Sequence, residues 1–138
     1  MDDISIHLIE DRTPLCEDIV RYINSFAVRE ELNDNNFFQA RDLWFYKREL
    51  CLFRFGHISN WKTSQVTDMR YTFSDREEFN EDISKWDVSN VTNMEGMFCN
   101  AYKFNSDISG WNVSKVKNMY AMFYFAISFN CDISRWDV

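Results

Sequence analysis

Apolar positions return every 25 residues through the second half of the chain. The pattern is carried by two columns, Trp61, Trp86, Trp111 and Trp136, and Ile58, Ile83, Ile108 and Ile133. Copies of the motif F-N-x-D-I-S-x-W begin at Phe79, Phe104 and Phe129. A fixed period of this length is typical of proteins built from stacked repeats. We therefore predict units at 54–78, 79–103 and 104–128, a partial unit at 129–138, and a helical N-terminal cap at 1–53.

Each unit contains two patterns of local structure. The segment around Ile83 is interpreted as a short strand. Apolar residues in 91–101 have the spacing of one helix face: Val91, Met94, Met97, Phe98 and Ala101. Strands of neighbouring units would pair in parallel, about 4.8 Å apart. The fold predicted from these patterns is an α/β, right-handed solenoid whose isoleucines form a column in the core.

Two helices are predicted before the repeats. Thr13 and Pro14 suit a helix start, and apolar residues follow at helical spacing: Leu15, Ile19, Tyr22, Ile23 and Phe26. This predicts a helix over 14–27. A second helix, over 36–48, would begin at Asn36 and present Phe37, Ala40 and Trp44 on one face. Both are expected to cover the open end of the first unit.

Composition narrows the class of protein. Hydrophobic residues make up 46% of the 138 positions and aromatic residues 17%, which is enough for a packed core. The formal charge of −7 disfavours binding to nucleic acids and to anionic membranes. The sequence starts without a basic region followed by an apolar stretch, so we do not expect secretion by a classical signal. An intracellular protein is the expectation.

The repeat and the residues before it resemble a known family. The unit F-N-x-D-I-S-x-W-[DN]-V-S-x-V-x-N-M-x-x-M-F-x-x-A is similar to the BspA-like leucine-rich repeat, the 25-residue repeat of mycoplasma lipoproteins. The cap of that family is matched by Asn33 to Asn36, by Ala40 and Trp44, and by Gly56 to Ser59. The resemblance implies a protein-protein interaction module without catalytic residues. Because a signal peptide and a lipidation cysteine are missing, an intracellular, viral or protist origin is expected. If the protein is viral, we expect it in the host cytoplasm or in the virion.

Two alternative functions follow from weaker resemblances. The first predicted helix, 14–27, is similar to the first helix of an F-box, which would imply a ubiquitin-ligase adaptor. The family's occurrence in large DNA viruses would allow a structural component of a virus particle.

Catalytic and metal-binding patterns are missing from the sequence. His7 has no recognisable partner, and His57 is expected to make a structural hydrogen bond. Cys16, Cys51, Cys99 and Cys131 form no C-x-x-C pair and occupy different positions of the repeat. No nucleophile elbow, phosphate loop or zinc-protease motif occurs. We therefore predict no enzyme activity and no cofactor.

Three columns of polar or aromatic residues run through the repeats, and two of them leave alternatives open. Asp82, Asp107 and Asp132 would either accept backbone N–H groups or hold cations between them. Asn80, Asn105 and Asn130 would satisfy backbone groups at a bend. The tryptophans would pack inside if the chain turns a corner at Lys85, and would otherwise form an exposed aromatic stripe.

Positions that vary between units suggest where a partner binds. The first unit has Arg70, Tyr71, Ser74, Asp75 and Glu77 there, the second Glu95, Gly96, Cys99, Asn100 and Tyr102, and the third Tyr120, Ala121, Tyr124, Phe125 and Ile127. A solvated face does not need apolar residues. We predict a protein partner, of unknown identity, at Tyr120, Tyr124, Phe125 and Ile127, together with Trp136. The sequence stops just after a predicted strand with no cap, so self-association through that last coil is one expected mode.

Overall fold

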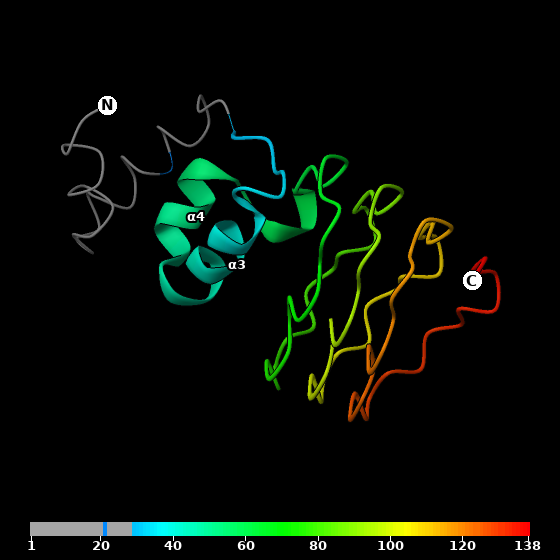
Figure 1. Ribbon diagram of the computed structural model, residues 1–138. Helices are drawn as coiled ribbons and strands as arrows, with labels where there is room; N and C mark the ends of the chain where they lie inside the picture. Colours follow the sequence, from blue (N-terminus) through cyan, green and yellow to red (C-terminus); the bar gives the residue numbers. More distant parts are fainter. Residues whose placement is uncertain (1–20, 22–28) are drawn as a thin grey trace.

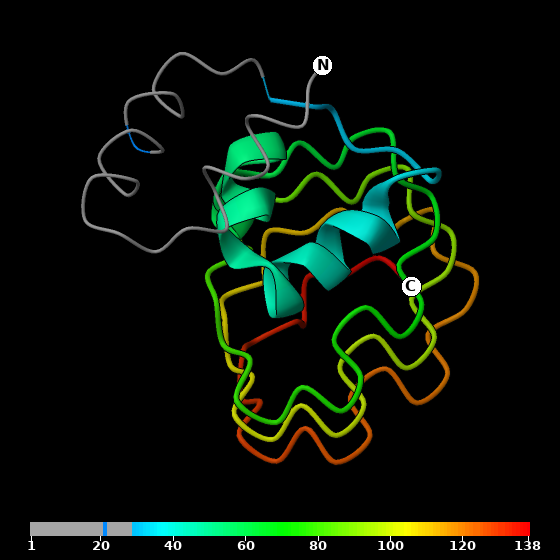
Figure 2. The same ribbon diagram turned by 90° about the vertical axis from the view of Figure 1, so that its left-hand side faces the viewer.

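The computed structural model describes Arg21 and residues 29–138. Over residues 29–138, helical structure is confined to α3 (Phe37–Tyr46), α4 (Arg48–Arg54) and the 3-10 turn η1 (Ile58–Asn60). The 25-residue units follow as successive turns of irregular backbone (Figure 1). Seen from the end, these turns lie over one another and follow the same path (Figure 2).

The predicted α/β solenoid is wrong. Over residues 29–138, the two short α-helices precede the repeats, and no strand or sheet forms. Contacts of the β type are limited to isolated parallel bridges, Asn33–Gln65, Asp68–Asn93 and Asn93–Asn118. The units are therefore neither strand-and-helix coils nor turns of a parallel sheet.

Consecutive turns replace the predicted helix over 91–101. The N–H of Met97 donates to the carbonyl of Met94 at 3.2 Å, and that of Ala101 to Phe98 at 3.1 Å. Gly96 and Asn100 have φ of 56° and 57°, in the left-handed region, so the chain changes direction between turns. A run of turns brings residues three apart to the same side, which is the spacing that predicted a helix.

A turn also replaces the strand predicted around Ile83. The Asp82 carboxylate accepts the N–H of Ser84 at 2.9 Å, and the carbonyl of Ile83 accepts the N–H of Trp86 at 3.1 Å. This corner allows Ile83 and Trp86, three residues apart, to be buried together.

Backbone hydrogen bonds between units hold the stack in register. Alternate N–H groups of the first unit donate to the second: Met69 to Asn93, Tyr71 to Glu95, Phe73 to Met97 and Asp75 to Cys99, all at 2.8–2.9 Å. The N–H groups of Thr72 and Ser74, which lie between them, close turns inside their own unit. The carbonyls of Met69, Tyr71 and Phe73 accept from Thr72, Ser74 and Arg76 of their own unit. The return bonds from the second unit that a parallel ladder requires are therefore missing there.

Stacked phenylalanines fill one side of the core. Phe73, Phe98 and Phe123 follow each other at centroid distances of 5.7 and 5.6 Å. A second column, Phe79, Phe104 and Phe129, lies beside the first, with 3.8 Å between Phe98 and Phe104. Offset stacking of this kind adds about 0.5–1.5 kcal/mol per pair beyond the burial of apolar area.

The tryptophans lie inside the stack, as the corner interpretation predicts. Trp61, Trp86 and Trp111 are 3–4% exposed, and Trp136 is half-buried. The indole N–H of Trp86 donates to the carbonyl of Ile58 at 2.8 Å, that of Trp111 to Ile83 at 3.2 Å, and that of Trp136 to Ile108 at 3.2 Å. These three indoles are thereby bonded to the preceding unit, which aligns the isoleucines in the same register.

Helix α3 covers the open side of the first unit. Phe37, Ala40 and Trp44 are buried on its inner face, as predicted, and Phe37 packs edge-on against Trp86 at 5.8 Å. The helix ends at Tyr46, because Lys47 leaves the helical conformation, and α4 starts one residue later. Asn36 stands at the N-cap position but makes no capping bond, since its side chain binds Asn33 and Glu31 instead. The helix predicted over 14–27 lies outside the described residues.

Candidate binding surface

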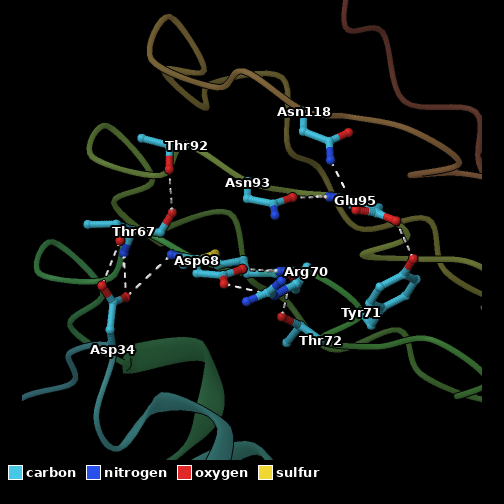
Figure 3. Close-up of polar contacts among 11 residues, drawn as sticks. Asp34, Thr67, Asp68, Arg70, Tyr71, Thr72, Thr92, Asn93, Glu95 and Asn118 are labelled. Carbon is cyan, nitrogen blue, oxygen red and sulfur yellow. Dashed lines mark hydrogen bonds and ion pairs between the residues drawn. The ribbon is translucent and has the colours of Figure 1, made fainter.

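A polar network connects the segment before α3 to the repeats (Figure 3). The Asp34 carboxylate accepts the backbone N–H of Thr67 at 2.7 Å, the hydroxyl of Thr67 at 2.6 Å and the N–H of Asp68 at 3.3 Å. Burial raises the pKa of Asp34, but the bonds from Thr67 and Asp68 outweigh it, so the pKa lies below its usual value. Asp34 thus supplies acceptors to the edge of the first unit, as a preceding unit would.

Tyr71 bridges the first two units on the same side of the molecule. Its hydroxyl donates to Glu95, and the other Glu95 oxygen accepts the side-chain amide of Asn118 at 3.0 Å (Figure 3). The hydrogen bond to Glu95 raises the pKa of the Tyr71 phenol. The ring of Tyr71 lies across Gly96, where a Cβ atom would come within 2.3 Å of the Tyr71 Cε1 atom. These contacts serve packing between units.

The aspartate column has a structural role. Asp82, Asp107 and Asp132 each accept the N–H of the serine two residues on, at 2.9–3.0 Å. Hydrogen bonds from the hydroxyl and the backbone of Ser84 and of Ser109 lower the pKa of Asp82 and of Asp107, and the backbone N–H of Ser134 does most to lower that of Asp132. The interpretation of these carboxylates as backbone acceptors is confirmed.

Asparagines form a second ladder along the stack. The side-chain oxygen of Asn80 accepts the backbone N–H of Asn105 at 2.8 Å, and that of Asn105 accepts the N–H of Asn130 at 2.8 Å. Their predicted role, satisfying backbone groups at a bend, is confirmed, and the bonds run between units.

Histidine and cysteine side chains are also occupied by packing. His57 accepts the N–H of Ser59 at 3.2 Å through Nδ1, and its ring lies edge-on to Trp44 at 4.9 Å, so its predicted structural bond is confirmed. Cys51 is buried, and desolvation raises the pKa of its thiol to about 12. Cys51, Cys99 and Cys131 are free thiols. Among residues 29–138, no three His, Cys, Asp or Glu side chains are grouped to hold a metal ion.

Exposed apolar side chains gather on the third unit. Tyr120, Tyr124, Phe125 and Ile127 are 77%, 58%, 56% and 75% exposed, and we call these four residues the apolar face. The rings of Tyr124 and Phe125 touch edge-on at a centroid distance of 4.5 Å. The structure thus exposes four of the five side chains predicted for partner binding, and two of them are in contact. The fifth, Trp136, is stacked on Trp111 at 6.4 Å and is half-buried against the core.

Hydrogen bonds show which side chains occupy equivalent places on this surface. The Asp75 N–H bonds to Cys99, as the Asn100 N–H bonds to Tyr124, so Asp75, Asn100 and Phe125 are equivalent. Likewise the Lys103 N–H bonds to Glu77 and the Ser128 N–H to Tyr102, which makes Glu77, Tyr102 and Ile127 equivalent. Each column therefore changes from a carboxylate in the first unit to an exposed apolar side chain in the third.

The backbone at Phe125 is in a conformation that its side chain does not favour. Asp75, Asn100 and Phe125 all have φ between 53° and 58°. Asp and Asn tolerate this left-handed region, whereas a bulky residue there costs about 1–3 kcal/mol. The third unit holds an exposed aromatic ring at a position where the other units have a polar residue suited to the backbone.

One family model matches most of the chain. The family described as Mycoplasma protein of unknown function, DUF285, matches residues 23–138. The chain belongs to this family. DUF285 is a repeat family related to BspA-like proteins, so the predicted relationship is confirmed at that level. No curated protein and no solved structure matches this DUF285 chain.

The F-box resemblance finds no support in this match. The family model covers residues 23–138 as a DUF285 region, and the apolar positions at 15–26 fall outside the described residues. Over the part of the chain that the structure describes, no helix has the length and apolar character needed to cross a bilayer.

Several residues of the site were missed by the sequence analysis. Asp34 lies 33 residues from Thr67, and no local pattern marks that contact. The Tyr71–Gly96 contact could have been found from the sequence, because Gly96 follows Tyr71 by one repeat period of 25 residues. The left-handed column was also signalled, by Asp75 and Asn100, which are residue types that favour this backbone.

Proposed function

We propose that this DUF285 chain is a non-enzymatic protein-interaction module and that a partner protein binds the apolar face. The observation that carries the proposal is the change along equivalent positions, from Asp75 and Glu77 in the first unit to Phe125 and Ile127 in the third. Stability of the stack does not require that change, because Asp75 and Asn100 hold the same backbone and form the same bonds between units.

The chemistry of the apolar face suits protein recognition. Tyrosine and phenylalanine are enriched in the buried centres of protein interfaces, where they supply large contact areas. Exposed apolar residues scattered singly are common on proteins, but contiguous ones mark interaction sites. The unfavourable backbone at Phe125 supports the same conclusion, since such strain clusters at functional sites.

The non-enzymatic part of the proposal is supported by the hydrogen bonds that the polar side chains make. Asp82 and Asp107 bind backbone N–H groups, and His57 binds the backbone of η1. A catalytic site needs polar side chains that converge on a cleft with spare bonding capacity. The polar side chains named here are instead used in building the stack.

Site-directed photo-crosslinking tests the proposal. A photoreactive aromatic amino acid replaces Tyr124, and in a control chain it replaces Lys85, which is exposed and lines a groove that contains no residue of the apolar face. The expected result is a discrete protein adduct from position 124 that is lost when Phe125→Lys is added. Equal adducts from both positions contradict the proposal.

Sedimentation of the purified chain identifies one candidate partner, a second copy. If the apolar face binds itself, the wild type sediments as a dimer, and the Tyr124→Glu, Phe125→Lys double variant sediments as a monomer that still unfolds cooperatively. Its unfolding midpoint should no longer depend on protein concentration. A monomeric wild type leaves a different protein as the partner, which the crosslink then has to show.

A further inference from the structure

A strip of carboxylates lies at the opposite end of the surface that carries the apolar face. Asp75, Glu77, Glu78 and Glu81 line a groove of about 420 Å³ beside Trp44 and Phe45 of α3. We call these four carboxylates the acidic end. Two arginines, Arg48 and Arg76, also line the groove.

The positive charges near the acidic end are already engaged. Arg76 donates to the hydroxyl of Tyr46 at 2.9 Å, and its guanidinium lies over the Phe45 ring at 4.3 Å. Arg48 donates to the carbonyl of Trp44 at 2.7 Å and lies over its ring at 3.5 Å.

Three carboxylates of the acidic end form no ion pair with a cation. Lys103 pairs with Glu78 at 2.6 Å. Asp75 accepts the side-chain amide of Asn100 at 2.7 Å, and within residues 29–138 none of Asp75, Glu77 and Glu81 forms an ion pair. These three carboxylates therefore leave negative charge at one end of the surface.

The other end of the same surface is built from a stretch of sequence without charged residues. From Asn118 to Cys131 the sequence contains no Asp, Glu, Lys or Arg. The two ends are separated by two unit steps. The centroid distances between the rings of Phe73, Phe98 and Phe123 give these steps as 5.7 and 5.6 Å. An extended chain advances about 3.3 Å per residue, so about three or four residues span this separation.

We infer that the partner is a protein segment with a basic side chain at one end, lying against Asp75 and Glu77, and apolar side chains at the other, covering the apolar face. This inference rests on the proposed function and adds the sign of the partner's charge, its orientation along the stack and the spacing of its anchors. The apolar contact supplies most of the affinity, and the charge contact sets the direction in which the segment lies.

Two defined peptides test the inference by fluorescence anisotropy. The first has Leu-Phe at one end and Arg-Arg at the other, joined by a short serine spacer, and the second has Glu-Glu in place of Arg-Arg. The wild-type chain is expected to bind the first peptide about three- to tenfold more tightly at low ionic strength, which corresponds to two exposed ion pairs. The difference should shrink at high salt, because exposed charges are screened.

Matched variants locate the charge effect. Asp75→Asn with Glu77→Lys should abolish the preference for the basic peptide, and Asn suits this backbone because Asn100 already occupies the equivalent place. The control, Glu31→Lys with Asp137→Lys, adds slightly more positive charge at exposed positions elsewhere and should keep the preference.

The possible outcomes separate this inference from the proposed function. If both peptides bind equally and both are lost with Tyr124→Glu and Phe125→Lys, the apolar face binds protein but the acidic end does not select, and the inference is overturned. Absence of binding by either peptide also overturns it, while the crosslink from position 124 still decides the proposed function.

Discussion

Replacing Gly96 by alanine should destabilise the stack through two effects that can be measured separately. The first is the backbone, since φ at Gly96 is 56° and an L-residue there costs about 1 kcal/mol relative to glycine. Ala121, at the equivalent place in the third unit, has φ of 53°, so the stack accepts alanine in this conformation.

The second part is the Tyr71 ring. The new Cβ atom would lie 2.3 Å from its Cε1 atom and 2.5 Å from its Cδ1 atom, so the ring has to leave. Its hydroxyl then loses Glu95, a bond to a charged group on an exposed surface, worth about 1–2 kcal/mol with the lost packing. Together the two parts lower the free energy of unfolding by about 2–3 kcal/mol.

Urea unfolding of four variants measures both parts. In a Tyr71→Ala background, Gly96→Ala should cost only the backbone part, so the coupling between the two positions is about 1–2 kcal/mol. Gly110→Ala is the matched control, because nothing lies within 4 Å of its Cβ position and its φ is not in the left-handed region. That change should be neutral or slightly stabilising. A Gly96→Ala cost that is the same with and without Tyr71 would refute the assignment to the ring.

Three further outcomes follow from single contacts. Trp86→Phe should lower the free energy of unfolding by about 1–3 kcal/mol, because it removes a buried N–H bonded to the preceding unit, and a urea titration showing no loss would contradict this. The folded pKa of Asp34 is depressed, so its contribution to stability is present above the unfolded value of about 3.9 and is lost as pH falls through the folded pKa. The gap in urea midpoint between the wild type and Asp34→Asn should therefore close on acidification below about pH 4; a pH-independent gap would count against it. Cys51, whose pKa is raised to about 12, should stay unalkylated by iodoacetamide in the native chain while Cys99 reacts, as peptide mass spectrometry would show; equal labelling of both would be inconsistent with its burial.

The register of the repeats could be predicted from the sequence, but the local backbone could not. The tryptophan column and its corner at Ile83 follow from one constraint, that two apolar residues three apart must both be buried. The same spacing over Val91 to Ala101 does not distinguish a helix from a run of turns. The difference depends on Gly96 and Asn100, whose left-handed conformation interrupts any helix.

The sequence identified which residues are exposed on the candidate surface, but it did not indicate how they are arranged in space. Tyr120 and Ile127 are marked by comparison with the polar residues of the first unit, and both are exposed. Trp136 could not be assigned, because its burial depends on the bond of its indole to Ile108 in another unit. The acidic end depends on the position of α3 beside the first unit, which no local pattern specifies.

The asparagine ladder has an evolutionary consequence. The bond from Asn105 to Asn80 and the bond from Asn130 to Asn105 have the same length, 2.8 Å, and join the same atoms. A gene that gains or loses one whole copy by recombination between similar stretches of DNA therefore yields an array whose new junction has partners already in place. A recombination that shifts the register by any other length would leave the asparagine side chains at that junction without their partners, so gains and losses of units should occur in multiples of the period.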